Sequence, residues 1–375
     1  MGKMSDNNSS KNNEPRIGKT LRDDIHQIKM KEDFGTEYRS LKEYYLTEER
    51  KKKLESMGKF KRFFIIPWWL LKALFFKLTP FRRILLLIAI VLIMMAGDNK
   101  ISSDNVSINL VGTAMIGGLI LLFILALELK DKLLARTELA EGRAVQKALM
   151  PEANPEVAGW DIWLYTKPAN DVGGDLLDFL KLSEDKVCIS VGDVAGKGLS
   201  AALLMAKLQS TIRAIVPDYN SLMELGEKIN RIFCRDSLPK LFASLVYIEL
   251  DVTSGKIKIL NAGHLPPLII RNDIIEKLKI TSPALGLIPD TLFNEQTAEL
   301  HTGEYLIIYS DGLTEALNEE GNFFGENKLV EILTENSNQS SEYLGGKILA
   351  EISTFIGKTK IHDDLTIAII KRTAV

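Results

Sequence analysis

The sequence of 375 residues contains only two cysteines, Cys188 and Cys234, and four histidines. Two thiols are too few for a disulfide framework or a four-cysteine zinc site, and both lie in apolar surroundings that suit a reduced, cytosolic fold. A metal ion would therefore have to be bound by oxygen. Hydrophobic residues make up 46% and charged residues 26% of the chain, which excludes wholesale disorder and a many-helix transporter.

No apolar segment begins near the first residue, so we expect no secretory signal peptide. The region 1–62 is polar, and its first 13 residues are too polar to bury a core. Residues 1–83 contain 20 Lys and Arg against 11 Asp and Glu, whereas residues 84–375 contain 27 against 38. Because no nucleic-acid-binding motif accompanies the basic part, we expect no nucleic-acid partner and interpret the excess as juxtamembrane.

Residues 63–127 indicate a membrane anchor. In residues 63–81, aromatic residues alternate with lysines, which predicts a segment lying in the lipid interface; a buried amphipathic helix is the alternative. Two apolar runs follow, at 84–97 and 106–127, which as helices would be about 21 and about 33 Å long. Basic residues flank both outer ends, so the positive-inside rule predicts a two-span hairpin in the inner (cytoplasmic) membrane, with both ends in the cytoplasm. Two buried core helices are the alternative.

Residues 128–150 are charged with an apolar stripe and predict a linker helix that stops before Pro151. The stripe is either a homodimer seam or the face that packs on the following domain. Residues 151–375 predict a mixed α+β domain, because two helices follow three strands and further strands are joined by short turns. Antiparallel sheets covered by helices suit this order better than a doubly wound parallel sheet. The expected strands are 161–166, 187–194, 242–251, 256–262, 305–310 and 365–371, and the expected helices are 200–216, 222–234, 327–335 and 341–356.

Aspartates stand at the ends of several expected strands. They are Asp175 in VGGDLLD, Asp193 in ISVGDVAGKG, Asp311 in LIIYSDG, and Asp363 with Asp364 in HDDLTIAII. A single Asp-Gly junction is usually a turn, but several carboxylates brought to one edge would repel one another unless a cation neutralised them. Mg²⁺ and Mn²⁺ prefer such oxygen ligands. The pattern predicts a divalent metal site and leaves its reaction open.

Other chemistries are disfavoured by spacing. GDVAGKG lacks the glycine spacing and the Ser or Thr of a nucleotide-binding P-loop, although Lys197 in it suits a phosphate contact. Neither cysteine is followed by an arginine six positions on, which argues against cysteine-based phosphoester hydrolysis. His362 with Asp363 forms an HD pair, but no further histidines are suitably placed around it.

The motifs QKALMPE, KPANDVGGDLLD, VGDVAGKGLSAALLMAKL, LFASLVYIELD, NAGHLPPLIIR, IIYSDGLTEALN and DDLTIAII follow one another in this order. Together they resemble the SpoIIE-like (RsbU-type) branch of the metal-dependent PPM, or PP2C-type, protein serine/threonine phosphatases, over about residues 141–372. The resemblance implies a four-layer αββα sandwich, in which two antiparallel sheets are flanked by helices. It also implies two Mn²⁺ or Mg²⁺ ions at one edge of the sheets.

By this resemblance Asp193 and Asp175 are catalytic, and the metal ligands are Asp175, Asp193, the Val194 carbonyl, Asp311 and Asp363. Asp364 supports the site, Asp178 is a weaker supporting residue, and His264 in NAGH is either a family histidine or a turn residue. The implied function is a membrane-anchored phosphatase acting on phosphoserine or phosphothreonine of a cytosolic regulatory partner, such as an anti-sigma-factor antagonist. The alternative is an inactive receptor or scaffold of the same fold that binds a phosphoprotein.

Overall fold

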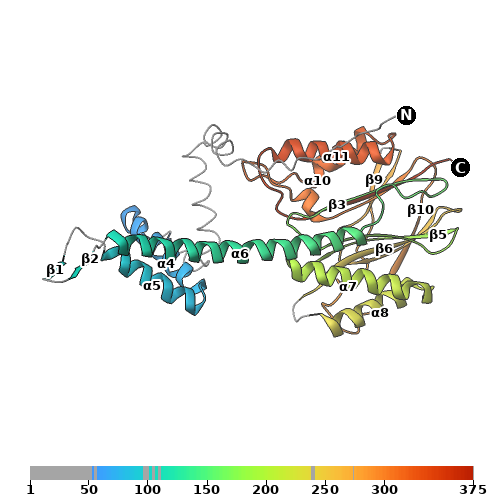
Figure 1. The fold of residues 1–375 in the computed structure, drawn as a ribbon. Helices are drawn as coiled ribbons and strands as arrows, with labels where there is room; N and C mark the ends of the chain where they lie inside the picture. Colours follow the sequence, from blue (N-terminus) through green and yellow to red (C-terminus); the bar gives the residue numbers. More distant parts are fainter. Residues whose placement is uncertain are drawn as a thin grey trace, which may run out of the picture. The chain divides into compact units, whose positions relative to one another are not determined.

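The computed structural model describes residues 53–54, 57–95, 101–103, 106–108, 111–237, 241–272 and 274–374. The chain divides into two compact units, Met1–Lys132 and Leu133–Val375 (Figure 1). The expectations for residues 1–52 lie outside the described residues. The domain boundaries expected from the sequence, at 62, 127 and 150, remain predictions.

Among the described residues of the first unit are three long helices and a small hairpin. Its elements are α4 (Lys59–Lys77), α5 (Pro80–Met94), the antiparallel strands β1 (Ile101–Ser103) and β2 (Val106–Ile108), and α6 (Val111–Leu149), which continues into the second unit. The second apolar run was expected to be helical from Val106, and this is wrong. Val106 pairs with Ser103, so the helix begins at Val111 and then continues without interruption through the expected linker.

Helices α5 and α6 contact each other through small residues. A Cβ on Gly117 of α6 would lie 2.8 Å from the carbonyl oxygen of Ala89 of α5, and Ala89 is fully buried. Closer to the start of α5, Arg82 donates to Glu128 and Asp131 of α6, both at 2.6 Å. Close backbone approach at Gly and Ala is typical of helices that pack in a membrane.

The second unit is built from two five-stranded antiparallel sheets. One sheet has the strand order β10 (Glu295–Glu299), β7 (Lys256–Ala262), β6 (Ala243–Asp251), β5 (Lys186–Val194), β4 (Asp175–Lys181). The other has the order β3 (Trp160–Lys167), β12 (Leu365–Arg372), β11 (Tyr305–Tyr309), β8 (Leu268–Arg271), β9 (Ile274–Lys277). Strands β3 and β9 are thus the two edges of the second sheet.

Helices cover the outer face of each sheet, as Figure 1 shows for α7 and α8 on one side and α10 and α11 on the other. The helices are α7 (Leu199–Ile215), the short turn η1 (Val216–Asp218), α8 (Leu222–Asp236), the single turn α9 (Asp311–Thr314), α10 (Glu326–Glu335) and α11 (Ser341–Ile356). One apolar cluster fills the space between the sheets and includes Ile189 and Ile308. Two more lie under the helix layers, around Ile229 and Ile348. The expected four-layer αββα sandwich is confirmed.

Two helical stretches of the described residues are long and apolar enough to cross a membrane by length and composition, Thr113–Leu149 and Leu199–Asp218. The second contains α7, whose Met205, Leu208 and Ile212 are buried against the first sheet, so it belongs to the core of the sandwich. Helix α5 has 15 residues and is shorter than a full span.

Candidate active site

The predicted acidic residues lie at one edge of the sandwich because of how the strands pair. Asp175 begins β4 and Asp193 stands near the end of β5, and the two are direct partners in the antiparallel register. Asp311 follows β11 after one residue, while Asp363 and Asp364 come directly before β12. Strands β11 and β12 are antiparallel neighbours, so the end of one meets the start of the other. Residues separated by as many as 189 positions therefore share one edge.

Asp364 joins the two sheets at this edge. Its buried carboxylate accepts hydrogen bonds from the N–H groups of Ala169 at 2.7 Å, Gly174 at 2.6 Å and Asp175 at 3.3 Å. Its carbonyl oxygen accepts from the Ser310 hydroxyl at 3.1 Å. Asp364 therefore fixes the loop before β4 relative to β11 and β12.

Asp175 has a buried carboxylate that is only partly satisfied. Its side chain is 5% exposed, and Oδ2 has no hydrogen-bond partner among the described residues. Burial raises the pKa of Asp175 well above its ordinary value, and the nearby charges of Asp193 and Asp364 raise it further. A buried carboxylate oxygen without a donor is an energetic cost that a cation would remove.

The neighbouring carboxylates also disfavour each other's charge. Burial raises the pKa of Asp193 to about 6, and the charges of Asp311, Asp363 and Asp364 add to the shift. The pKa of Asp311 is raised first by burial and then by Asp363. Mutual repulsion between carboxylates in a partly buried site is the electrostatic condition under which a divalent cation binds strongly.

Lys197 supplies a positive charge at this edge. Its ammonium lies 3.1 Å from Oδ2 of Asp363 and donates to the His362 carbonyl oxygen, also at 3.1 Å. Lys197 stands in the Gly-rich loop between β5 and α7, where Gly196 and Gly198 have φ of 122° and 73°. Positive φ is readily accessible to glycine, so this loop can place the lysine beside the acids.

The donor set fits a hard divalent cation. A Cβ on Gly174 would lie 3.1 Å from the Val194 carbonyl oxygen and 3.5 Å from Oδ1 of Asp193, so the absent side chain leaves these two oxygens accessible. No three His, Cys, Asp or Glu side chains of the described ranges are arranged closely enough to form a ready-made metal site. Mg²⁺ usually retains several waters and needs only one or two carboxylates from the protein, so this arrangement fits such an ion.

His264 lies behind Asp193 and is connected to it through Ser244. Its Nδ1 is 2.8 Å from the Ser244 hydroxyl oxygen, which in turn accepts from the Asp193 N–H at 3.2 Å. Burial lowers the pKa of His264 to about 4, so the ring is neutral at pH 7. Through Ser244, His264 therefore holds the backbone at Asp193. Ser244 was not predicted as a site residue: it lies in the LFASLVYIELD motif, where it looks like an ordinary strand serine.

Asp178 lies outside the carboxylate group. It projects from the face of β4 that meets α7, whereas Asp175, three residues earlier, faces the other way. Its carboxylate accepts two hydrogen bonds from Arg213 of α7, at 2.8 and 2.6 Å. Arg213 also donates to the carbonyl oxygen of Leu149 at the end of α6. Asp178 therefore holds Arg213, which links α7 to the end of α6. Any effect of Asp178 on the site would be indirect.

Gln146 is a site residue that sequence reasoning missed, although it opens the QKALMPE motif. Its side chain in the last turn of α6 is buried and bonds to both backbone groups of Gly173, in the loop that precedes Asp175. Its place in the QKALMPE motif was the available signal, because its partner lies in a loop whose position only the fold determines.

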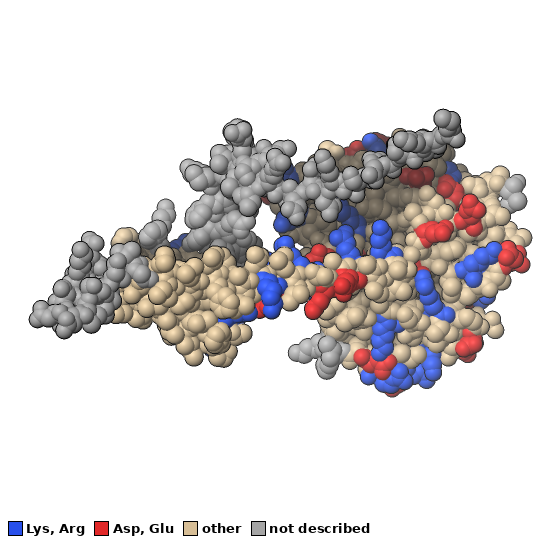
Figure 2. Space-filling view, viewed as in Figure 1, with Lys and Arg blue, Asp and Glu red and all other residues tan. Residues whose placement is uncertain are grey.

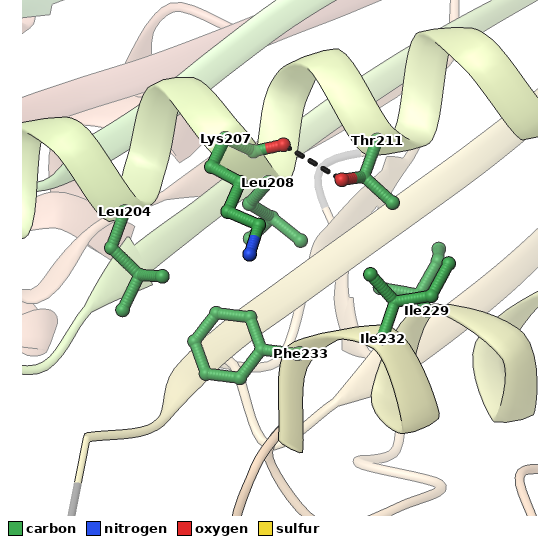
Figure 3. Close-up of a pocket in the computed structure, with 7 residues that line it drawn as sticks. All are labelled: Leu204, Lys207, Leu208, Thr211, Ile229, Ile232 and Phe233. Atoms are coloured by element: carbon green, nitrogen blue, oxygen red, sulfur yellow. Dashed lines mark hydrogen bonds between the residues drawn. The ribbon is translucent and has the colours of Figure 1, made fainter. Parts of the chain in front are cut away.

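The small pocket between α7 and α8 lies elsewhere. Figure 3 shows Leu204, Phe233 and Ile229 facing one another across it, with Lys207 at its side. Its volume of about 10 Å³ is no larger than a water molecule requires, so it is a packing gap.

Comparison with known proteins identifies the family. The sequence profile described as Stage II sporulation protein E (SpoIIE) matches residues 183–373, which is half of the chain. The chain belongs to the SpoIIE family. This family is the SpoIIE/RsbU-type branch of the PPM phosphatases, in agreement with the two antiparallel sheets and their flanking helices.

Individual proteins are similar to a large part of the chain. Protein IcfG of Synechocystis is 30% identical over 277 residues, which cover 66% of this chain and 43% of that protein. Phosphoserine phosphatase RsbU of Bacillus subtilis is 23% identical over 242 residues, covering 63% and 70%. The SiaA-PP2C domain of Pseudomonas aeruginosa has the same fold, with a TM-score of 0.56, 19% identity and coverage of 64% and 98%. The chain spans less than half the length of IcfG.

Proposed function

We propose that this SpoIIE-family chain is a protein phosphatase that hydrolyses phosphoserine or phosphothreonine in a regulatory protein, using two Mn²⁺ or Mg²⁺ ions. The observation that carries the proposal is the group of acidic residues at one sheet edge, with the unpaired buried oxygen of Asp175 among them. The name of RsbU as a phosphoserine phosphatase supports the substrate class.

The residues of the chain divide the work between holding ions and supporting their ligands. The ions would be held by Asp193, Asp311, Asp363 and the Val194 carbonyl. Asp175, at the start of β4, would be a further ligand. When bound, such ions lower the pKa of a shared water and neutralise charge on phosphoryl oxygens. Lys197 adds a positive charge beside Asp363 that a phosphoryl group would also contact.

The test uses the full chain purified in detergent, with p-nitrophenyl phosphate as substrate. We expect Mn²⁺-dependent turnover that falls at least roughly a hundredfold in Asp193→Asn, because this replaces an anionic ligand with a neutral one. Asp185→Asn is the matched control, since Asp185 lies in the turn at the opposite end of the β4–β5 hairpin. Turnover that does not need metal, or that Asp193→Asn leaves intact, would refute the assignment. Phosphoprotein binding without any turnover would favour an inactive scaffold.

We further propose that α5 and α6 form a two-span hairpin in the cytoplasmic membrane, with the phosphatase domain in the cytoplasm. Large apolar side chains of both helices are exposed, among them Leu87, Leu119 and Leu122. Figure 2 shows this unit as a mostly tan surface with few charged side chains. Helix α5 is about 22 Å long as an α-helix, so Arg82 and Arg83 would have to reach the headgroups from inside a locally thinned bilayer.

Cysteine labelling tests this topology. Ser102 lies in the turn region between the two spans and would face outward, whereas Thr137 of α6 would face the cytoplasm. In a background with Ser at position 234, Ser102→Cys should react with an impermeant maleimide on intact spheroplasts, and Thr137→Cys should react only after lysis. Equal labelling of both positions before lysis would contradict the hairpin.

The substrate is proposed to be a cytosolic phosphoprotein of the anti-sigma-factor-antagonist type. Lipid would surround the hairpin, and a second copy of the chain would form a homodimer with the first. Helix α6 runs from the hairpin to Gln146, which holds the loop before Asp175. A change in the hairpin would therefore reach the metal ligands through one helix.

A further inference from the structure

A groove lies at the C-terminal end of the edge strand β3, beside the acidic residues. It consists of two adjoining hollows that share Tyr165 and Lys167. The first has a volume of about 390 Å³ and lies between the end of α6 and β3, where Figure 2 shows Lys and Arg side chains along a hollow. The second, of about 310 Å³, lies between β3 and the end of α11. We call the two together the β3 groove.

The first hollow is lined by positively charged side chains without an ion-pair partner among the described residues. Arg143, Lys147 and Lys167 are exposed, and none of them forms an ion pair with any described residue. Arg143 and Lys147 are also four residues apart on α6, a spacing at which like charges repel and destabilise a helix. Lys147 lies in the last turn of α6, where a cation is favoured, but this does not account for Arg143 beside it, whereas an anionic ligand in the hollow would accommodate both.

The strand edge in this hollow offers main-chain hydrogen bonds. Both backbone groups of Thr366 in β12 bond toward Ser310, since its N–H donates to the Ser310 hydroxyl and its carbonyl accepts from the Ser310 N–H. In an antiparallel pair the residue opposite then directs its own groups outward. That residue is Thr166, so its N–H and carbonyl face the groove and can pair with an extended chain.

The second hollow is apolar and continues from the first. Its accessible apolar side chains are the partly exposed Leu349 and Ile361, which lie beside the buried Ile352, Ile356 and Leu365 and the polar Ser353 and Thr359. An occupant that bridges both hollows would therefore carry negative charge at one end and apolar side chains at the other.

The groove passes beside the proposed metal ligands. Pro168 lines the first hollow, and the next residue, Ala169, donates its N–H to Asp364. Ile361 and Leu365 of the second hollow flank Asp363 and Asp364 in the sequence. Residues that line the groove are thus sequence neighbours of Asp363 and Asp364 or of a residue that bonds to Asp364.

We propose that the β3 groove binds the segment of the phosphoprotein substrate next to the phosphorylated residue. This segment is extended, acidic where it meets Arg143, Lys147 and Lys167, and apolar where it meets α11. This role rests on the proposed phosphatase function and specifies which residues surround the phosphorylated residue of the substrate.

The experiment compares two short synthetic phosphoserine peptides with the full chain in detergent. One carries Asp and Glu on one side of the phosphoserine and Leu and Val on the other; the second has Lys in place of the acids. Phosphate release with Mn²⁺ is expressed relative to turnover of p-nitrophenyl phosphate by the same protein. Binding of both peptides is measured separately by fluorescence anisotropy, which needs no turnover.

We expect the acidic peptide to be preferred roughly tenfold, through KM, because several exposed charges each contribute modestly. The preference should shrink with added salt. Arg143→Glu with Lys167→Glu should reverse the preference in both assays. Lys256→Glu is the matched control, because this exposed lysine begins β7 at the opposite edge of the sandwich.

Equal binding of the two peptides, or a preference that the double charge reversal leaves intact, would overturn the proposal. A change of oligomeric state in the reversed variant without a change in peptide preference would assign the groove to a second copy and also overturn it. If p-nitrophenyl phosphate is not hydrolysed but the acidic peptide still binds in the groove, the phosphatase function fails and the docking inference stands.

Discussion

The Gln146 side chain bonds to both backbone groups of Gly173. Its Nε2 donates to the Gly173 carbonyl oxygen at 2.8 Å, and its Oε1 accepts from the Gly173 N–H at 3.1 Å. The next two residues, Gly174 and Asp175, donate their N–H groups to Asp364. The end of α6 and the start of β12 thus hold the same loop from two sides, and Asp175 occupies the position that results.

Gln146→Ala should therefore weaken metal binding as well as stability. It leaves two buried backbone groups of Gly173 unpaired, at a cost of about 1–3 kcal/mol in the free energy of unfolding, and it frees the loop that carries Asp175. We expect a higher Kd for Mn²⁺ by calorimetry. Gln209→Ala is the control, because Gln209 also holds α6, through the Leu149 carbonyl, without touching the loop. Equal effects of the two substitutions on Mn²⁺ affinity would contradict this role.

Metal affinity should depend on pH through Asp193. In the metal-free protein its pKa is raised from 3.8 to about 6, so a proton must leave before a cation binds below that pH. The Kd for Mn²⁺ should rise about tenfold per pH unit below 6 and level off above 7. Calorimetric titration of the protein with Mn²⁺, in buffers of different ionisation enthalpy, should show proton release near pH 5.5. A Mn²⁺ affinity that is constant from pH 5 to 7 would contradict the role of Asp193.

The same shift predicts how the metal-free protein responds to pH. A raised pKa means that the folded state binds more protons than the unfolded state between about pH 4 and 6, so stability falls as pH rises through this window. The loss is on the order of 3 kcal/mol at about 1.4 kcal/mol per pKa unit. Thermal unfolding at several pH values in the presence of a chelator measures this loss of stability. Saturating Mn²⁺ should remove the fall in stability with rising pH.

Two buried aspartates on β4 should respond oppositely to the same substitution. Asp175→Asn removes a buried charge whose Oδ2 has no partner, so the metal-free protein should become more stable at pH 8. Asp178→Asn weakens the paired bonds with Arg213 and leaves that guanidinium less well matched, so stability should fall by about 1–3 kcal/mol. Urea unfolding in a chelator compares them, and changes of the same sign would contradict the assignment.

Neighbouring glycines in α6 test the packing of the hairpin. A Cβ on Gly117 would lie 2.8 Å from backbone of α5, whereas Gly118 has open space at that position. Gly117→Leu should therefore lower the Tm of the first unit in detergent by separating α5 from α6, and Gly118→Leu should leave it nearly unchanged. A tolerated Gly117→Leu would show that the contact at Ala89 is not needed.

Regular elements with a strong apolar period were predictable from the sequence. Strand β7 and helix α11 have the bounds that their patterns predicted, since α11 buries one consistent face and β7 contributes apolar side chains to the cores on both sides of its sheet. Strand β4 was not predicted, because buried Asp178 interrupts its apolar face and only Arg213 on another element explains that residue. Strands β8, β9 and β10 were not predicted either. They are four or five residues long, and β9 and β10 are polar edge strands with few buried side chains.

The sequence by itself determined which residues carry charge at strand ends, where the apolar spans lie, and, through seven ordered motifs, the family. The tertiary structure decided which carboxylates become neighbours. The pairing of Asp175 with Asp193 is a matter of strand register, and the bonds from Asp364 and Gln146 depend on long-range packing. Local sequence encodes the period of an element, but the contacts across a sheet edge are set by the free energy of burying both sheets together.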